Sequence, residues 1–242
     1  TQFILWDEVE AFDTTNFNIK LSSSTSKLQK LHPSDLADII EEMGVHSRTK
    51  LFEEMDEEKA ADVLEELEPY AQAQVIESLS VSKAADLLEK MPADEVADLF
   101  DELEDDKVEE LLNEMETESS EEVRELLEYD KDEVGSLMTT DFMSFHKTTT
   151  VEATLQTMKK KKPEADMIYS LFVVDENERL VATVSLRDLV ISQPEMTLSE
   201  IMNTEFISVK DEDQIDTLAM IILKYDLLAI PVVDANKILT GM

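Results

Sequence analysis

A twelve-residue repeat in the first half of the chain constrains the fold more than any other feature. A large aliphatic residue returns at every twelfth position, in the series Leu31, Met43, Met55, Leu67, Leu79, Met91, Leu103, Met115 and Leu127. Between these anchors the apolar residues keep an i, i+3, i+4, i+7 spacing, which is typical of a helix with one apolar face. Twelve residues leave room for roughly two and a half helical turns and a short connection. Because such short helices are marginal alone, we expect residues 31–130 to form an all-α superhelical repeat domain.

The opposite face of these predicted helices is acidic. An Ala-Asp pair recurs at a fixed place, as Ala37-Asp38, Ala61-Asp62, Ala85-Asp86 and Ala97-Asp98. At about 100° per residue, these aspartates lie roughly opposite the apolar stripe, and Asp94 lies one turn before Asp98. Residues 31–130 carry 34 acidic and 7 basic side chains, so −27 of the net charge of −36 resides there. Because like charges one turn apart repel, this surface favours the binding of cations.

The composition argues against several classes of function. A net charge of −36 disfavours nucleic acid as a partner, since phosphate binding needs a basic surface, and anionic membrane surfaces would repel the chain. Cysteine is absent, which excludes disulfides, thiolate metal sites and cysteine nucleophiles and fits a reducing cytosol. The three scattered histidines disfavour zinc. Because no serine–histidine–acid arrangement or phosphate loop occurs, we expect a protein that is not an enzyme.

The ends of the chain suggest a fragment. No apolar stretch approaches the ~20 residues that a membrane helix needs, and no signal peptide is evident. The chain also lacks an initiator methionine, so we interpret it as a soluble piece of a longer protein. Residues 1–30 are interpreted as an upstream remnant and linker, with strands at 3–6 and 9–12 and a serine-rich linker at 22–26.

Beyond residue 135 the pattern changes to short strands that alternate with helices. The order strand, helix, strand, strand, helix is predicted at 142–145, 151–162, 168–174, 180–184 and 185–188. The order then begins again, at 206–209, 213–224, 227–233 and from 238 onward. The sequence therefore predicts an α/β domain at 131–195 and a second copy at 196–242 that is incomplete at its C-terminal end.

Several motifs in this half resemble a tandem pair of CBS domains. They are GSLMT at 135–139, FVVD at 172–175, VSLRDL at 184–189, IM at 201–202, YD at 225–226 and IPVVD at 230–234. The pair follows an acidic helical repeat that opens with LHPSDLAD at 31–38. Together and in this order, the motifs resemble the cytosolic region of MgtE-type magnesium transporters. The resemblance implies a multidomain chain, an all-α repeat domain followed by an α/β CBS pair.

The resemblance also implies a set of magnesium ligands. In that family, acidic residues of the helical domain face acidic residues of the second CBS copy across bound Mg²⁺. The matching positions in this chain are Asp62, Asp94, Asp98, Asp216 and Asp226. Carboxylates without Cys and with few His suit a hard cation such as Mg²⁺ or Ca²⁺. The alternative is that these aspartates form only a solvated helix face.

One position departs from the family pattern. Gln214 stands where the family has an acidic residue, and the neighbouring acidic residues 211–213 are candidates to compensate. Further ligands of the family would lie beyond residue 242, so some sites in this chain would be incomplete.

A second candidate site is for an adenosine nucleotide such as ATP. CBS pairs often place an aspartate on the ribose and a basic residue near phosphate, which assigns these roles to Asp188 and Arg187. The spacing of Ser185 and Asp188 also predicts a helix cap, with serine as the capping residue and aspartate in the first turn. Ser170 and Ala182 weaken the nucleotide assignment, because relatives offer an aromatic residue at the first position and a glycine at the second.

Together, these features predict a regulatory function. The chain would sense intracellular Mg²⁺ and gate a transmembrane pore encoded downstream, at the cytoplasmic face of the cell membrane. Repulsion would hold the acidic domain away from the CBS pair, and bridging Mg²⁺ would dock the two. A homodimer through the CBS domains is expected. The alternatives are a CBS module that senses adenosine nucleotides and a helical-repeat scaffold for a basic protein partner.

Overall fold

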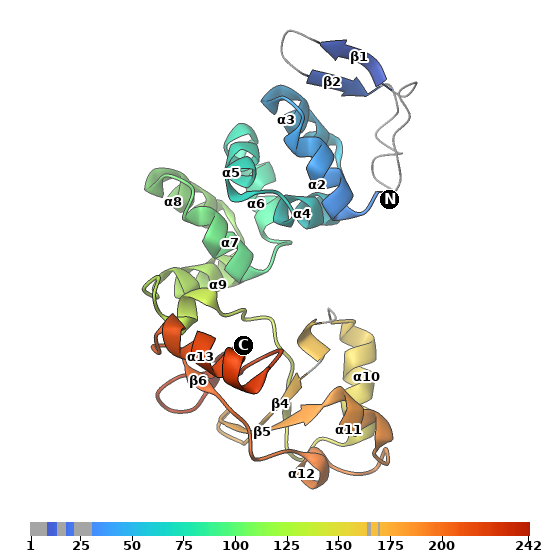
Figure 1. The fold of residues 1–242 in the computed structure, drawn as a ribbon, viewed down its shortest axis with the longest axis vertical. Helices are drawn as coiled ribbons and strands as arrows, with labels where there is room; N and C mark the ends of the chain where they lie inside the picture. The colour runs from blue at the N-terminus through green and yellow to red at the C-terminus, as the bar shows by residue number, and fades with distance from the viewer. Residues whose placement is uncertain (1–8, 14–17, 22–30, 164–165, 169) are drawn as a thin grey trace. The chain divides into compact units, whose positions relative to one another are not determined.

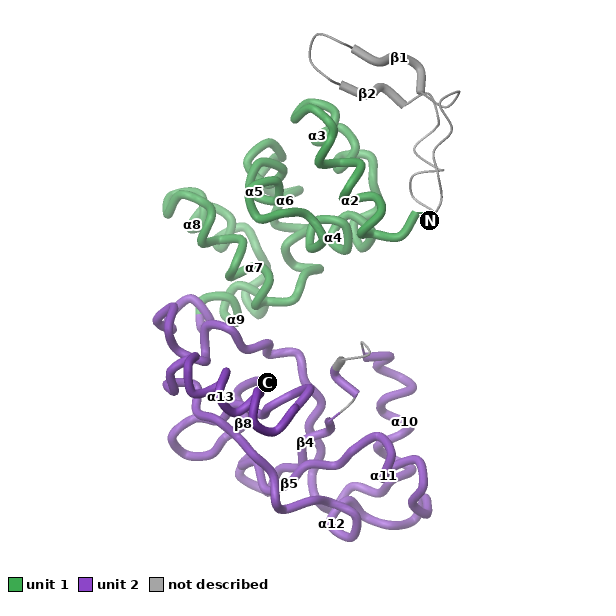
Figure 2. Tube along the Cα trace, in the orientation of Figure 1, with its two compact units in different colours: residues 1–124 green, residues 125–242 purple. Residues whose placement is uncertain are grey.

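The structure is a computed structural model, and it describes residues 9–13, 18–21, 31–163, 166–168 and 170–242 (Figure 1). Contacts divide the chain into two units, residues 1–124 and 125–242 (Figure 2). In the first unit, β1 (Val9–Asp13) pairs antiparallel with β2 (Asn18–Leu21). The strand predicted at 9–12 is therefore confirmed, and its partner was not predicted. The expected strand at 3–6 and the linker at 22–26 lie outside the described residues.

The repeat forms a series of short helices. They are α2 (Pro33–Glu41), α3 (Val45–Glu54), α4 (Glu57–Glu65), α5 (Pro69–Ser78), α6 (Val81–Leu88), α7 (Ala93–Phe100), α8 (Asp105–Glu114) and α9 (Thr117–Leu127). Successive helices begin twelve residues apart, and the fully described stretch 31–127 contains no strand. The all-α repeat domain that the spacing predicts is confirmed.

The helices pack in two alternating rows. Helix α2 packs on α4, α4 on α6 and α6 on α8, while α3 packs on α5 and α5 on α7. The structural unit is therefore a helix pair, which spans two sequence repeats. Ala37, Ala61 and Ala85 occupy equivalent places on α2, α4 and α6, and all three are buried. Their small side chains let neighbouring helices approach closely, which leaves the aspartate that follows each alanine exposed.

The apolar anchors build one continuous core. Met55, Leu67, Leu79, Met91, Leu103 and Met115 are buried in it, while Leu31 and Met43 are partly buried and pack against it. Leu127 at the other end is 38% exposed. The end of α2 is capped from the next helix, because Arg48 donates from Nε to the Ile40 carbonyl at 2.9 Å and from Nη2 to the Glu41 carbonyl at 2.8 Å. Such bonds satisfy carbonyls that a helix end leaves without partners.

The second unit contains two α/β copies in the predicted order. The first consists of β3 (Ser144–His146), α10 (Val151–Lys161), β4 (Ser170–Val174), β5 (Leu180–Ser185) and α11 (Leu186–Ile191), preceded by η2 (Val134–Leu137); η3 (Asp166–Ile168) lies before β4. The second consists of β6 (Val209–Lys210), α13 (Ile215–Tyr225), β7 (Val232–Val233) and β8 (Leu239–Gly241), preceded by α12 (Leu198–Ile201). Each sheet joins a parallel pair to an antiparallel hairpin.

Strand boundaries differ from the prediction in several places; Ile168, predicted to begin a strand, lies in η3, and β4 begins at Ser170. The first strand begins at Ser144 and not at residue 142, and β6 begins at Val209 and not at residue 206. The stretch predicted as a strand at 227–233 is paired only over Val232 and Val233. Pro231 lacks a backbone N–H and cannot donate to the sheet, and β6 offers only two residues for pairing.

The two copies interlock through the segments that precede them. The N–H of Val134, ahead of the first copy, donates to the Asp213 carbonyl in the β6–α13 turn of the second copy at 2.8 Å. The N–H of Leu198, ahead of the second copy, donates to the Thr149 carbonyl in the β3–α10 turn of the first copy at 2.9 Å. Each copy is therefore completed by the leading segment of the other, which places both copies in one unit.

Candidate functional site

Two of the predicted magnesium ligands lie one turn apart on α7. Asp98 is exposed and Asp94 is half-buried, while Val96 between them is fully buried in the core. Because Val96 faces the core, Asp94 and Asp98 lie on the opposite face of α7. The pKa of Glu95 is raised, first by desolvation and then by the charges of Asp94 and Asp98, although its side chain remains exposed. The part of this shift that comes from Asp94 and Asp98 reflects the repulsion between neighbouring carboxylates on this helix.

Asp62 occupies an equivalent exposed position on α4. Its neighbours Ala61 and Val63 are buried, so the aspartate points away from the core. Asp62, Asp94 and Asp98 all belong to the first unit, as the sequence predicts, but they sit on helices of the two different rows.

Asp216 and Asp226 lie at opposite ends of α13. Both are exposed; Asp216 is in the first turn, and Asp226 ends the helix with a φ of 51°. Ten residues at about 1.5 Å each separate them by roughly 15 Å along the helix axis. Magnesium holds its ligands at about 2.1 Å, so these two carboxylates cannot share one ion. If both are ligands, the second copy contributes to at least two separate cation positions.

Among the described residues, no three acidic or histidine side chains lie close enough together to hold a metal ion. Mg²⁺ often keeps several waters and accepts one or two carboxylates, so exposed single aspartates still fit it chemically. An ion held in this way gains its second protein ligand only when another acidic surface approaches.

The predicted nucleotide residues form a well-built helix cap. The N–H of Asp188 donates to Ser185 Oγ at 3.1 Å, and that hydroxyl donates to Asp188 Oδ2 at 2.6 Å. Arg187 Nη1 lies 3.6 Å from Asp188 Oδ1, and the arginine side chain is 79% exposed. The capping role is therefore confirmed, and the exposed Arg187 side chain is paired with the capping aspartate.

A cleft of about 170 Å³ lies within the second unit. It is lined by Ser170, Phe172, Thr183, Asn203, Glu205, Phe206, Ile207, Leu227, Ala229 and Pro231. Sequence analysis linked only Ser170 among these to a nucleotide, because the residues come from segments that only the fold brings together. The volume is below the roughly 300 Å³ of common ligand pockets, and Glu205 would repel phosphate. Neither Arg187 nor Asp188 lines this cleft.

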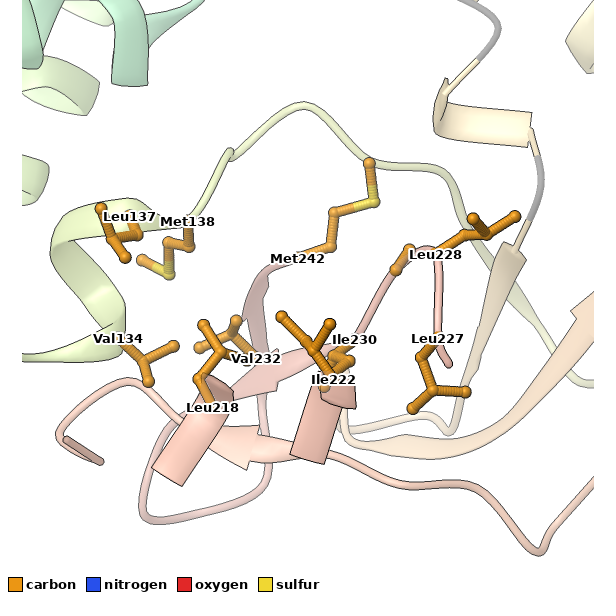
Figure 3. Close-up of a pocket in the computed structure, with 11 residues that line it drawn as sticks. Val134, Leu137, Met138, Leu218, Ile222, Leu227, Leu228, Ile230, Val232 and Met242 are labelled. Atoms are coloured by element: carbon orange, nitrogen blue, oxygen red, sulfur yellow. The ribbon is translucent and has the colours of Figure 1, made fainter. Parts of the chain in front are cut away.

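A second pocket of about 170 Å³ is apolar (Figure 3). Side chains from η2, α13 and β7 surround it, together with Leu227, Leu228 and Met242. At the matching position in the first copy, Met158 of α10 is only 9% exposed. In the second copy Ile222 remains 42% exposed. This lining offers no ligand to a cation, so the groove is not a metal site.

No helix among the described residues is both long enough and apolar enough to cross a membrane.

Comparisons with known proteins agree with this architecture. The model of the MgtE intracellular N domain matches residues 31–132, and the CBS domain model matches residues 134–194 and 198–242. The magnesium transporter MgtE of Thermus thermophilus is 36% identical over 117 residues, which is 48% of this chain and 26% of that protein. The matched segment thus spans about a quarter of this curated relative.

Solved structures cover more of the chain. The cytosolic domain of the Mg²⁺ channel MgtE in complex with ATP aligns with a TM-score of 0.81 and 31% identity, over 90% of this chain and 89% of that one. The soluble part of a magnesium transporter aligns with a TM-score of 0.68 and 27% identity, over 89% and 90% of the two chains. With an acidic helical repeat followed by two interlocked CBS copies, this chain belongs to the MgtE family.

Proposed function

We propose that this chain is the Mg²⁺-sensing regulatory region of a magnesium transporter, acting at the cytoplasmic face of the membrane on a pore encoded downstream. It would act by binding and not by catalysis. The observation that carries the proposal is the placement of the five aspartates. Asp62, Asp94 and Asp98 lie on the acidic side of the array, and Asp216 and Asp226 mark the two ends of α13.

The mechanism follows from charge and linkage. Without a divalent cation, the −27 charge of residues 31–130 repels the acidic ends of α13, which keeps the two units apart. An ion that takes a carboxylate from each unit binds only when they dock, so Mg²⁺ shifts the population toward the docked state. Because Asp216 and Asp226 are roughly 15 Å apart on the helix, at least two ions would contribute, each at its own position.

A homodimer through the CBS copies is part of this proposal. Met220 and Leu223 of α13 are 63% and 86% exposed, and Leu228 is 84% exposed. Large exposed apolar side chains on one helix and in the loop after it are typical of an interaction surface, and a two-fold pairing is the commonest closed arrangement. Light scattering that finds only monomer at high protein concentration with Mg²⁺ would contradict the dimer.

An adenosine nucleotide is the second candidate ligand. A related MgtE cytosolic domain was solved with ATP, and Arg187 is exposed beside Asp188 in this chain. Calorimetric titration with ATP distinguishes this function from Mg²⁺ sensing. Tight ATP binding that weakens in R187A, without any response of the chain to Mg²⁺, would favour the nucleotide sensor. The scaffold alternative instead predicts a basic protein partner and indifference to millimolar Mg²⁺.

The Mg²⁺ proposal is tested with two triple variants of equal charge. D62N/D94N/D98N removes the proposed ligands, and D38N/D86N/D106N removes three other exposed aspartates of the same domain. Thermal melting is followed in MgCl₂ and in KCl of equal ionic strength, which matches the screening of charges. The ligand variant should lose most of the Mg²⁺-specific rise in melting temperature, whereas the control variant should keep it. If both variants lose the Mg²⁺-specific rise equally, the rise depends on the overall charge of the domain and not on the proposed ligands.

A further inference from the structure

The segment that joins α9 to the first CBS copy is bound to the second copy. The N–H of Gly135 donates to the Asp211 carbonyl at 2.8 Å, next to the bond from the Val134 N–H to the Asp213 carbonyl. The N–H of Ile215 at the start of α13 donates back to the Asp132 carbonyl at 3.0 Å. Three backbone bonds thus fasten this junction to the β6–α13 turn.

A side-chain contact adds to these bonds. The hydroxyl of Tyr129, two residues after α9, donates to Asp211 Oδ2 at 3.3 Å, and the N–H of Glu212 donates to Asp211 Oδ1 at 2.9 Å. Asp211 is 9% exposed, and it is the one buried charged side chain among the residues whose burial is described. A buried carboxylate is costly without partners, so removing the tyrosine hydroxyl leaves it poorly satisfied.

Gly135 makes room for the tyrosine ring. A Cβ atom at this position would overlap the ring of Tyr129, so a side chain there would have to displace the ring. The equivalent junction ahead of the second copy has the same backbone bond, from the Ser199 N–H to the Lys147 carbonyl at 2.9 Å. Serine and lysine stand there in place of glycine and aspartate. The ring, the glycine and the carboxylate are therefore specific to the junction that follows α9.

We propose that Tyr129, Gly135 and Asp211 form a latch that fastens the C-terminal end of α9 to the second CBS copy. Helix α9 begins at Thr117 in the first unit and ends in the second. Asp216 lies in the first turn of α13, directly after the turn that holds Tyr129. The latch thus couples a cation at Asp216 to the last helix of the array. This coupling rests on the proposed function, while the latch itself does not.

Hydrogen exchange at the amides of Val134 and Gly135 tests the latch without any metal. In the 242-residue chain, Y129F removes one hydroxyl and keeps the ring, and Y70F makes the same change at a tyrosine that is 72% exposed. Loss of a hydrogen bond to a buried carboxylate should speed exchange at both amides by about tenfold or more in Y129F. Y70F should change neither amide, and the Val173 amide in β4 should be unaffected in both variants. G135A should speed exchange further. Equal rates in Y129F and the parent would overturn the latch.

The coupling is then read from the Mg²⁺ dependence of the scattering radius. In Y129F the Mg²⁺ concentration at half-compaction should rise several-fold, while Y70F should follow the parent. Faster exchange in Y129F with an unchanged Mg²⁺ midpoint would overturn the coupling and leave the latch as a local fastening. If the parent itself does not compact in Mg²⁺, the proposed function fails, and the exchange result still decides the latch.

Discussion

Replacing Asp216 or Asp226 with Asn should each remove one separate share of the Mg²⁺-dependent stability. The two carboxylates lie at opposite ends of α13, roughly 15 Å apart along the helix, whereas two ligands of one Mg²⁺ lie within about 4 Å. Each ion at a hundred times its dissociation constant adds roughly 2.7 kcal/mol. Two ions should therefore add roughly 5 kcal/mol to the free energy of unfolding in the parent, and about half of that in either single variant.

The assay is urea unfolding in MgCl₂ and in KCl of equal ionic strength, since urea carries no charge of its own. Sites this far apart usually contribute additively, so D216N/D226N should show almost no Mg²⁺-specific gain. D141N, another exposed aspartate of the second unit, serves as the control and should behave as the parent. If D216N alone abolished the entire gain, the two residues would belong to one cooperative site, and the separation argument would be refuted.

Three further predictions concern the fold. The pKa of Tyr129 is raised from 10.0 to about 12, first by burial and then by the charge of Asp211, with smaller effects from its hydrogen bond and from Glu125 and Glu133. The protonated phenol is thus favoured in the folded state, so its stabilising effect is complete below pH 10 and is lost as pH rises through about 12. Tyrosinate absorbance should show one late-titrating group that is missing in Y129F, and its persistence there would contradict the assignment. Phe52→Ala in the array core should cost about 3–5 kcal/mol in denaturant unfolding, whereas Tyr70→Ala should change stability by about 0.5 kcal/mol or less; similar costs would contradict the core assignment. Ser185→Ala should destabilise the second unit by about 1 kcal/mol through loss of the α11 cap, an effect that an unchanged melting curve would disprove.

The array could be predicted closely because its information is local. The anchors and the apolar spacing repeat within each helix, so the twelve-residue period gives the number and the start of the helices. The pairing of alternate helices was not predicted, because the stripe shows only that a helix is covered and not which neighbour covers it. Ala37, Ala61 and Ala85 are buried on alternate helices, but Ala73 and Ala97 hold the same repeat position on α5 and α7, so the alanines do not mark the two rows.

In the CBS half, the order of elements was predictable and their contacts were not. Alternating apolar residues mark strands, but the short pairing of β6 with β7 depends on Pro231 and on the partner strand. The interlocking of the two copies, and the bond from Tyr129 to Asp211, join residues far apart in sequence that no local pattern connects. Likewise, the resemblance assigns Asp216 and Asp226 as ligands, but only the helix between them shows that they cannot share an ion.

Small-angle scattering of the 242-residue chain tests the central claim most directly. The radius of gyration is measured while MgCl₂ is titrated into the protein, with KCl of equal ionic strength as the reference. If carboxylates of both units share bound ions, Mg²⁺ should reduce the radius in a saturable way, and KCl should reduce it much less. If KCl reproduces the whole Mg²⁺ response, the acidic surface acts only through its overall charge, and the sensor proposal is wrong.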